Sequence, residues 1–277
     1  MSIELGKYNT LKVVKAVDFG LYLDGGEEGE ILLPQRYVPV GCQAGDELNV
    51  FLYLDQGERL IATTQTPLVQ VGQFAFLEVA WINQYGAFLH WGLMKDLFVP
   101  FSEQKQKMQV GRKYMVHAHL DEESFRIVAS AKVERYLSKD TSAYTVGQEV
   151  EILVWQKTDL GFKVIIEHAC AGLLYDNEIF QPLPVGMTLK AYIKQVRPDG
   201  KIDLCLQRPG RETVDDFAEQ LLQHLQAQGG FTPLHDKSPA EEIYALFGVS
   251  KKVFKKAVGD LYKKRLIVLE PNGIRLA

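Results

Sequence analysis

The sequence predicts a mainly β protein that ends in a small α+β domain. Three observations predict this class. Glycines recur at two fixed spacings in three places, the residues around them form short runs with β character, and the last quarter of the chain changes to helical spacing. A chain of 277 residues is long enough for two to four domains of ordinary size.

The glycine pattern divides the first three quarters of the chain into three repeats. In each repeat a central glycine follows an aromatic or apolar residue, a second glycine stands 14 residues before it, and a third stands 25 residues after it. Agreement of both spacings in three places indicates an internal repeat. The three sets are Gly6, Gly20 and Gly45; Gly72, Gly86 and Gly111; and Gly147, Gly161 and Gly186.

Each repeat is predicted to hold five short strands. Two β-rich runs meet near the central glycine, and a strand, a polar turn and a second strand follow the third glycine, as in "DELNVFLYLDQGERLIATT" (46–64). Five strands in roughly 60–65 residues fit a small Greek-key barrel of the OB type. The sequence therefore predicts three tandem OB-fold barrels, at residues 1–66, 67–137 and 138–210.

The remaining residues, 211–277, are predicted to form a winged helix-turn-helix domain. Apolar residues at helical spacing run from Val214 to Leu225, Ser238 and Gly248 are expected to cap a second helix, and Ser250 is expected to start a third. "LIVLEPNGIRL" (266–276) then reads as a hairpin around Pro-Asn-Gly. Three helices followed by a hairpin place the third helix in the recognition position.

Residues of about 5–207 resemble the S1 RNA-binding module. "QYGAFL" (84–89) matches the aromatic-Gly-x-aromatic stretch on its second strand. "AGLLYDNE" (171–178) resembles its Gly-Leu-x-His-x-Ser-Glu segment, with Tyr175 where histidine is usual. The S1-like resemblance implies an exposed aromatic platform on which bases stack, and such stacking contributes about 1–3 kcal/mol per base.

The resemblance also implies which rings form the platform. In the third repeat Leu160 and Lys163 replace two of the aromatics, which leaves Tyr175 as its ring. Trp81, Trp91 and Phe101 are interpreted instead as core or inter-domain packing. The implied platform residues are Tyr85, Phe88 and Phe98 in the second repeat, with Phe19 and Tyr22 as their equivalents in the first.

The order of the four domains is similar to that of the bacterial conserved virulence factor B, or CvfB-like, family. The segments "DKSPAEEIYALF" (236–247) and "FGVSKKVFKKAVGDLYKKRLI" (247–267) carry the most specific part of this resemblance, which covers essentially the whole chain. It implies a cytoplasmic protein that binds RNA with little sequence preference. It also implies an influence on gene expression, including virulence factors in some pathogens.

The formal net charge of −4 is distributed unevenly. Residues 1–66 carry −5, whereas the three later segments carry +1, −1 and +1. Affinity for a polyanion comes mainly from lysine and arginine, so the first repeat is a poor phosphate binder. We expect it to be structural, or to bind a protein partner near its acidic segment "DGGEEGE" (24–30).

In the third repeat, alternation along one strand places Lys190, Tyr192 and Lys194 on one face, and Lys201 joins them from the paired strand. A row of basic and aromatic side chains can hold a single-stranded nucleic acid.

The third C-terminal helix carries a second basic surface. Val253, Ala257, Val258 and Leu261 are predicted to be buried, and seven basic residues stand against one acid, Asp260. This surface is expected to continue the RNA-binding face. Its basic residues are Lys251, Lys252, Lys255, Lys256, Lys263, Lys264 and Arg265.

The sequence predicts no catalytic residues, no metal site and no cofactor. His117 and His119 share a strand face without a third ligand at metal spacing, and nothing near His168 and Cys170 orients them as base and nucleophile. No apolar stretch approaches the roughly 18–20 residues that span a bilayer, and the N-terminus lacks a secretion signal, so we expect a cytoplasmic protein without membrane contact.

These observations predict a non-catalytic, monomeric protein that binds single-stranded RNA with low sequence specificity and affects gene expression after transcription. Two alternatives stay open. One is a DNA-binding transcriptional regulator led by the winged helix, and the other is a scaffold whose barrels bind proteins.

Overall fold

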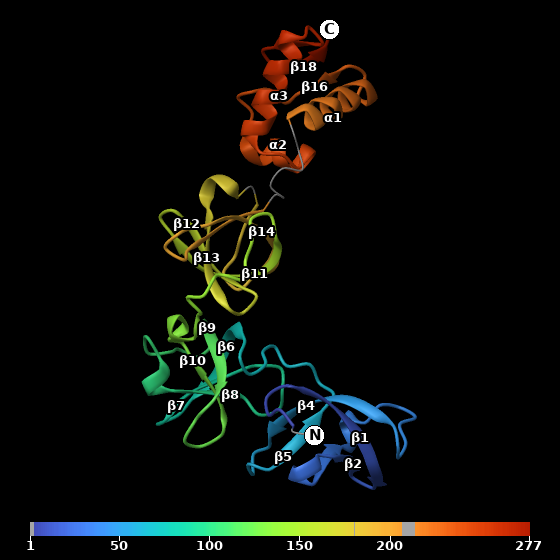
Figure 1. Ribbon diagram of the computed structural model, residues 1–277, viewed down its shortest axis with the longest axis vertical. Coiled ribbons are helices and arrows are strands. Elements are labelled where there is room, and N and C mark those ends of the chain that lie inside the picture. Colours follow the sequence, from blue (N-terminus) through green and yellow to red (C-terminus); the bar gives the residue numbers. More distant parts are fainter. Residues whose placement is uncertain (1–2, 180, 207–213) are drawn as a thin grey trace. The chain divides into compact units, whose positions relative to one another are not determined.

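The computed structural model describes residues 3–179, 181–206 and 214–277. The described residues fall into two compact units, which are divided between Leu137 and Ser138. The predicted fold class is confirmed: three closed five-stranded barrels are followed by three helices and a small sheet (Figure 1). None of the helices in the described ranges has the length and apolar character that crossing a membrane requires.

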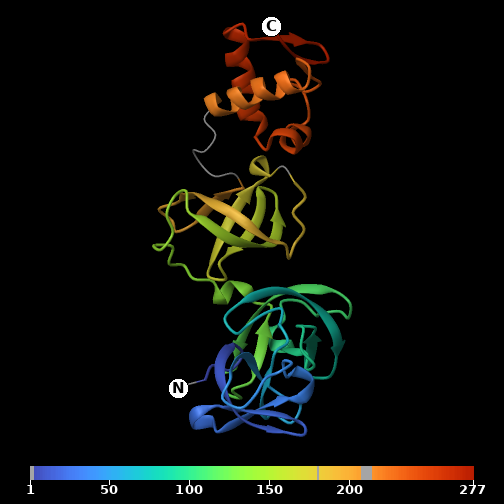
Figure 2. The same cartoon turned by 90° about the vertical axis from the view of Figure 1, so that its right-hand side faces the viewer.

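All three barrels have the same strand order. The first three strands of each barrel pair in sequence order, the fifth pairs in parallel with the third, and the fourth closes the barrel against the first. Figure 2 shows this winding in barrel 3 from a second side. Barrel 1 comprises β1 (Tyr8–Val17), β2 (Gly20–Asp24), β3 (Glu30–Pro34), β4 (Glu47–Leu54) and β5 (Leu60–Thr63). Barrel 2 comprises β6 (Phe74–Ile82), β7 (Gly86–Leu89), β8 (Leu97–Pro100), β9 (Lys113–Leu120) and β10 (Ile127–Ser130). Barrel 3 comprises β11 (Glu149–Thr158), β12 (Gly161–Ile166), β13 (Cys170–Tyr175), β14 (Thr188–Val196) and β15 (Ile202–Cys205).

Short 3-10 helices complete the repeat. One follows the third strand of each barrel, and two more lie before β3 and after β10. They are η1 (Gly26–Glu28), η2 (Gln35–Tyr37), η3 (Phe101–Glu103), η4 (Val133–Tyr136) and η5 (Asp176–Glu178). The strands of each barrel lie within the domain ranges expected from the sequence, while the boundary between residues 210 and 211 lies outside the described residues.

The C-terminal domain comprises α1 (Val214–Ala227), β16 (Phe231–Thr232), α2 (Ala240–Phe247), α3 (Lys251–Lys263), β17 (Ile267–Glu270) and β18 (Gly273–Leu276). Its sheet has the order β16-β18-β17. The two-residue strand β16 was not predicted, because it is too short to show a period. The side chain of Val214 lies outside the described residues.

The helix caps match the prediction in part. Ser250 is confirmed as the α3 cap, since its side chain accepts the Val253 amide, and Gly248 ends α2 at a φ of 72°. Ser238 is not the α2 cap. Pro239 takes the N-cap position with an extended ψ of 146°, and the Ser238 hydroxyl instead accepts the backbone amide of His235 at 3.0 Å.

The buried stripe of α3 also differs by one position. Phe254, Ala257, Val258 and Leu261 are buried in the domain core, whereas Val253 is only partly buried. Phe254 takes the buried position expected for Val253, because its ring packs against that of Phe217 on α1 at a centroid distance of 6.0 Å.

Close packing explains the central glycine of each repeat. A Cβ atom built on Gly20, Gly86 or Gly161 would lie only 2.1–2.3 Å from a backbone carbonyl oxygen of the neighbouring third strand. Those oxygens belong to Leu33, Val99 and Leu174. Backbone in a sheet cannot move aside easily, so the second and third strands can approach this closely only where the side chain is a hydrogen.

We therefore expect Gly86→Ala to destabilise the first unit by about 1–3 kcal/mol, since the added methyl overpacks against Val99. Urea unfolding of the full chain, followed by circular dichroism, measures this loss. Gly259→Ala is the matched control, because a Cβ there would meet nothing within 4 Å. Because Gly259 lies inside α3, Gly259→Ala is expected to raise the free energy of unfolding by up to about 1 kcal/mol. Unchanged stability in Gly86→Ala would contradict the packing explanation.

One hydrophobic cluster is shared by barrels 1 and 2, because Phe51 and Tyr53 of barrel 1 belong to the core of barrel 2, while the rest of barrel 1 has a core of its own. Phe51 on β4 is fully buried and packs edge-on against Trp91, at a ring distance of 5.8 Å. Lys95 donates a hydrogen bond across the junction to the carbonyl oxygen of Asp55 at 2.9 Å. The interpretation of Trp91 as packing is confirmed, and the two repeats form a single folded unit.

Candidate nucleic-acid interface

Three aromatic side chains form a continuous row across the first three strands of barrel 2. Trp81 on β6 is paired in register with Phe88 on β7, which is paired with Phe98 on β8. The Trp81 and Phe88 rings are stacked at 3.7 Å with an interplanar angle of 3°, and the Phe88 and Phe98 centroids are 4.9 Å apart. We call Trp81, Phe88 and Phe98 the aromatic ladder.

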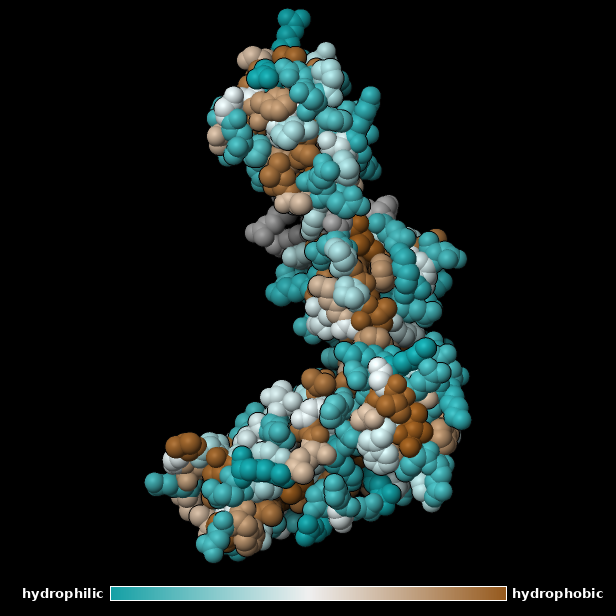
Figure 3. All heavy atoms as spheres, turned by 180° about the vertical axis from the view of Figure 1, so that it is seen from behind, coloured by the Kyte–Doolittle hydropathy of each residue, from teal (hydrophilic) through white to brown (hydrophobic). Residues whose placement is uncertain are grey.

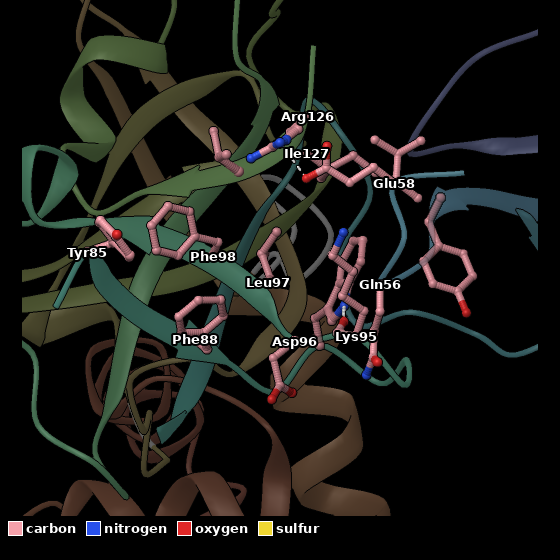
Figure 4. Close-up of a pocket in the computed structure, with 14 residues that line it drawn as sticks. Gln56, Glu58, Tyr85, Phe88, Lys95, Asp96, Leu97, Phe98, Arg126 and Ile127 are labelled. Carbon is pink, nitrogen blue, oxygen red and sulfur yellow. Dashed lines mark hydrogen bonds and ion pairs between the residues drawn. The ribbon is translucent and has the colours of Figure 1, made fainter. Parts of the chain in front are cut away.

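The ladder is partly open to solvent, since Phe88 and Phe98 are half-buried. Trp81 is 45% exposed, and Tyr85, immediately before β7, is 65% exposed. Figure 4 shows Tyr85 beside Phe88 and Phe98, so the structure brings together the three platform residues predicted for this repeat. Apolar side chains are visible on the surface of barrel 2 in Figure 3.

Trp81 corrects the sequence analysis, which assigned it to packing. Simple alternation from buried Val79 would turn Trp81 inward, but the strand register shifts between these two residues. Such a bulge adds a residue to one strand and reverses which face the following side chain occupies. The same shift occurs before Lys15 in β1 and before Gln156 in β11. Phe101, also assigned to packing, is 40% exposed at the start of η3.

A carboxylate fixes the orientation of the outermost ladder ring. The Trp81 indole donates to Asp96 at 2.9 Å, and Nδ1 of His90 lies 3.0 Å from the other oxygen of the same carboxylate. Asp96 precedes β8, so it ties the first strand of the ladder to the third. Holding the indole flat against Phe88 keeps a stacking surface prepared before any ligand binds.

The equivalent positions in barrel 1 hold only one ring. Lys15, Tyr22 and Leu32 occupy the three register positions there. The Lys15 ammonium lies 4.8 Å from the Tyr22 ring centre and forms an ion pair with Glu30 at 2.6 Å. Phe19 is exposed and packs edge-on against Tyr22 at 6.2 Å.

Barrel 3 holds no ring in the corresponding register row, which consists of Gln156, Lys163 and Leu173. Its predicted ring, Tyr175, is at the end of β13, where its hydroxyl accepts a hydrogen bond from Arg197. Arg197 also binds Asp203 through Nε at 2.8 Å. Tyr175 is thus held within a charged network rather than in a row of rings.

The predicted basic row of barrel 3 is paired with acids. Lys190 forms an ion pair with Glu149 at 2.6 Å, and the Tyr192 hydroxyl donates to the same carboxylate at 2.9 Å. These partners raise the pKa of Lys190. Lys194 pairs with Glu178 and Lys201 pairs with Asp199, which leaves little uncompensated positive charge on this face.

The lysines of α3 behave differently. Lys251 is tied to the backbone, since its ammonium donates to the carbonyl oxygen of Ser238 at 2.7 Å. The other six basic residues of this stretch are exposed, and within the described ranges none of them forms an ion pair. We call these six the α3 basic surface: Lys252, Lys255, Lys256, Lys263, Lys264 and Arg265.

The other titratable groups singled out in the sequence lie apart from these surfaces. His119 Nε2 is 3.2 Å from the Tyr136 hydroxyl, and the His117 ring stacks on Tyr136 at 4.1 Å. Burial raises the pKa of the Cys170 thiol and raises that of Cys205 to about 11. Both thiols are therefore protonated at neutral pH, the unreactive form of cysteine.

Two family models match parts of the chain. Residues 5–65 match the S1 domain, and residues 219–276 match the CvfB-like winged helix domain. Neither model describes an enzyme. The resemblance drawn from the sequence is confirmed by these matches and by the following relatives.

The relatives align over most of the chain. YitL of Bacillus subtilis (strain 168) is 28% identical, covering 98% of this chain and 93% of its own. Conserved virulence factor B of Staphylococcus saprophyticus is 23% identical, covering 98% of this chain and 94% of its own. A solved Streptococcus pneumoniae TIGR4 structure, described as a multidomain protein with nucleic acid binding domains, aligns with 99% of this chain and 98% of its own, at 24% identity and a TM-score of 0.42.

Proposed function

Because the chain carries an S1 domain and a CvfB-like winged helix domain, and is similar over nearly its whole length to conserved virulence factor B, we propose that it binds single-stranded RNA without catalysis. The proposal includes low sequence specificity, an effect on gene expression after transcription, a cytoplasmic location and a monomeric state. The observation that carries it is the partly exposed aromatic ladder of barrel 2.

The ladder suits single strands for a physical reason. Bases in a duplex already stack on one another, whereas the bases of a single strand can each place a face on an exposed ring. Every base has such a face, so stacking on Trp81, Phe88 and Phe98 favours binding with little discrimination between sequences.

The α3 basic surface supplies the charge that the ladder lacks. Its charged side chains have no acidic partners in the described part of the chain, so phosphates can bind them without first displacing a carboxylate. Barrel 1, whose segment carries a net charge of −5, is proposed to contribute structure and not phosphate contacts.

Binding of fluorescent single-stranded RNA, duplex RNA and duplex DNA over a salt series tests this function. We expect single-stranded RNA to bind most tightly, with an affinity that falls linearly on a logarithmic salt scale. Single strands of different composition should bind with similar affinity. If none of these nucleic acids binds, the proposal fails, and the barrels are better explained as a protein-binding scaffold.

A second candidate, a DNA-binding regulator of transcription, is favoured by one observation. Four residues of the α3 basic surface, Lys252, Lys255, Lys256 and Lys263, lie on the helix that a winged helix-turn-helix domain places in the major groove. In the same experiment this candidate requires that duplex DNA binds most tightly.

A further inference from the structure

A cavity of about 510 Å³ opens between barrels 1 and 2, next to the aromatic ladder. Tyr85, Phe88 and Phe98 lie on one side of it, and Gln56 and Glu58 from the β4–β5 turn lie on the other, with Leu97 between them (Figure 4). The cavity is thus built by two repeats, and two rings of the ladder, Phe88 and Phe98, line one of its sides.

The size and lining of the cavity fit a nucleobase. Binding sites for small organic groups commonly measure about 300–1,000 Å³ and combine apolar walls with a few polar groups. Here the aromatic rings and Leu54 and Leu97 offer apolar faces, while the Gln56 amide can both donate and accept hydrogen bonds. A flat base with polar edges matches this combination.

The charges around the cavity favour a neutral group in its interior. Two acids, Glu58 and Asp96, balance two bases, Lys95 and Arg126. Lys95 already donates to the Asp55 carbonyl oxygen, and burial lowers the pKa of Lys95. Asp96 already accepts from Trp81 at 2.9 Å. A phosphate gains little in such surroundings, because the positive charges are already compensated.

Arg126 at the rim is the one base here whose partner is exchangeable. It pairs with Glu58 from barrel 1, and both side chains are about half exposed, at 52% and 48%. An exposed ion pair of this kind contributes little to stability, typically about 0–1 kcal/mol. A phosphate can therefore replace Glu58 as the partner of Arg126, with a bidentate geometry that guanidinium groups favour.

We propose that the cavity holds one unstacked base of the RNA strand that lies on the aromatic ladder, with the adjoining phosphate on Arg126. This inference rests on the proposed function. It gives barrel 1 a direct part in binding, because its β4–β5 turn closes the cavity and its Glu58 competes with the phosphate.

The competition by Glu58 is tested with Glu58→Gln and a fluorescein-labelled single-stranded RNA of mixed sequence. We expect Glu58→Gln to bind about two- to five-fold more tightly, since Arg126 is released. Glu28→Gln is the matched control: it makes the same charge change on barrel 1, away from the cavity, and is expected to leave affinity unchanged. If both variants bind the RNA equally more tightly, the gain in affinity comes from net charge alone. The proposed exchange of Glu58 for a phosphate at Arg126 would then be wrong.

Occupation of the cavity is tested with Leu54→Trp, which fills it from the barrel 1 side without altering a ladder residue. The probe is the same RNA with 2-aminopurine at successive positions. In the unaltered protein we expect a fraction of the 2-aminopurine to show the bright fluorescence of an unstacked base, and Leu54→Trp to abolish that fraction and weaken binding several-fold. Val40→Trp, at a fully exposed position of barrel 1, is the control.

Two results separate this inference from the function on which it rests. If Phe88→Ala weakens binding while Leu54→Trp and Glu58→Gln both bind as the unaltered protein does, the ladder binds RNA and the cavity does not. If Phe88→Ala has no effect, the proposed function itself fails. Thermal unfolding of each variant shows whether the shared core of barrels 1 and 2 is intact.

Discussion

Phe88→Ala is expected to weaken the binding of single-stranded RNA by about 1–3 kcal/mol, a loss of roughly five- to 150-fold in affinity. Phe88 is the middle ring of the ladder, stacked on Trp81 at 3.7 Å and 4.9 Å from Phe98. Its removal interrupts the stacking surface and takes away the ring on which the Trp81 indole stacks. Fluorescence anisotropy with labelled RNA at fixed salt measures the loss.

Tyr22→Ala is the matched control for Phe88→Ala. Tyr22 occupies the same register position in barrel 1, but its neighbours across the strands are Lys15 and Leu32 instead of rings. We expect it to change affinity much less. Equal losses in the two variants would show that barrel 2 has no special part in binding. Because Phe88 is partly buried, its variant must also retain the melting temperature of the unaltered first unit.

Neutralising four lysines of the α3 basic surface is expected to have the second large effect. Replacing Lys255, Lys256, Lys263 and Lys264 with glutamine should weaken RNA binding at low salt. It should also make the dependence of log affinity on log salt shallower, by about 0.7 for each phosphate that the variant no longer neutralises. The physical reason is that each unpaired ammonium group that binds a phosphate releases a condensed counterion. A salt series with both proteins measures the two slopes.

The control for these lysines lies in barrel 3. Lys190, Lys194 and Lys201 each have a carboxylate partner, so their replacement with glutamine is expected to change the slope less. Should the barrel 3 variant instead show the larger decrease in slope, the phosphates bind the row that strand alternation indicated, and α3 is not the main binding surface.

The fold could be predicted from the sequence largely because its strongest constraint is local. Gly20, Gly86 and Gly161 are required by a carbonyl oxygen only 2.1–2.3 Å from where a Cβ would stand, so the spacing of the glycines records the packing of the strands. Ser250 and Gly248 mark helix ends for equally local reasons. The prediction that Ser238 caps α2 was wrong, because the Ser238 hydroxyl accepts a hydrogen bond from the backbone amide of His235, in the turn before the helix.

The candidate site was harder to predict, because it depends on register and on residues distant in the chain. A one-residue shift in β6 exposes Trp81, which alternation alone would bury. The acids that neutralise Lys190 and Lys194 lie 41 and 16 residues away along the chain. The partner of Arg126, Glu58, comes from another repeat. Nothing in the sequence around Arg126 except its charge indicates this ion pair.

The core shared by barrels 1 and 2 limits how these repeats can be separated. Phe51 of one repeat is buried against Trp91 of the next. Separating the two repeats would therefore expose both rings to water. Tandem repeats are often treated as independent domains that recombination can delete, duplicate or move one at a time. Here the smallest unit that can be exchanged intact is the pair of repeats. Gain or loss of one repeat would leave the apolar side chains of its neighbour uncovered at the junction.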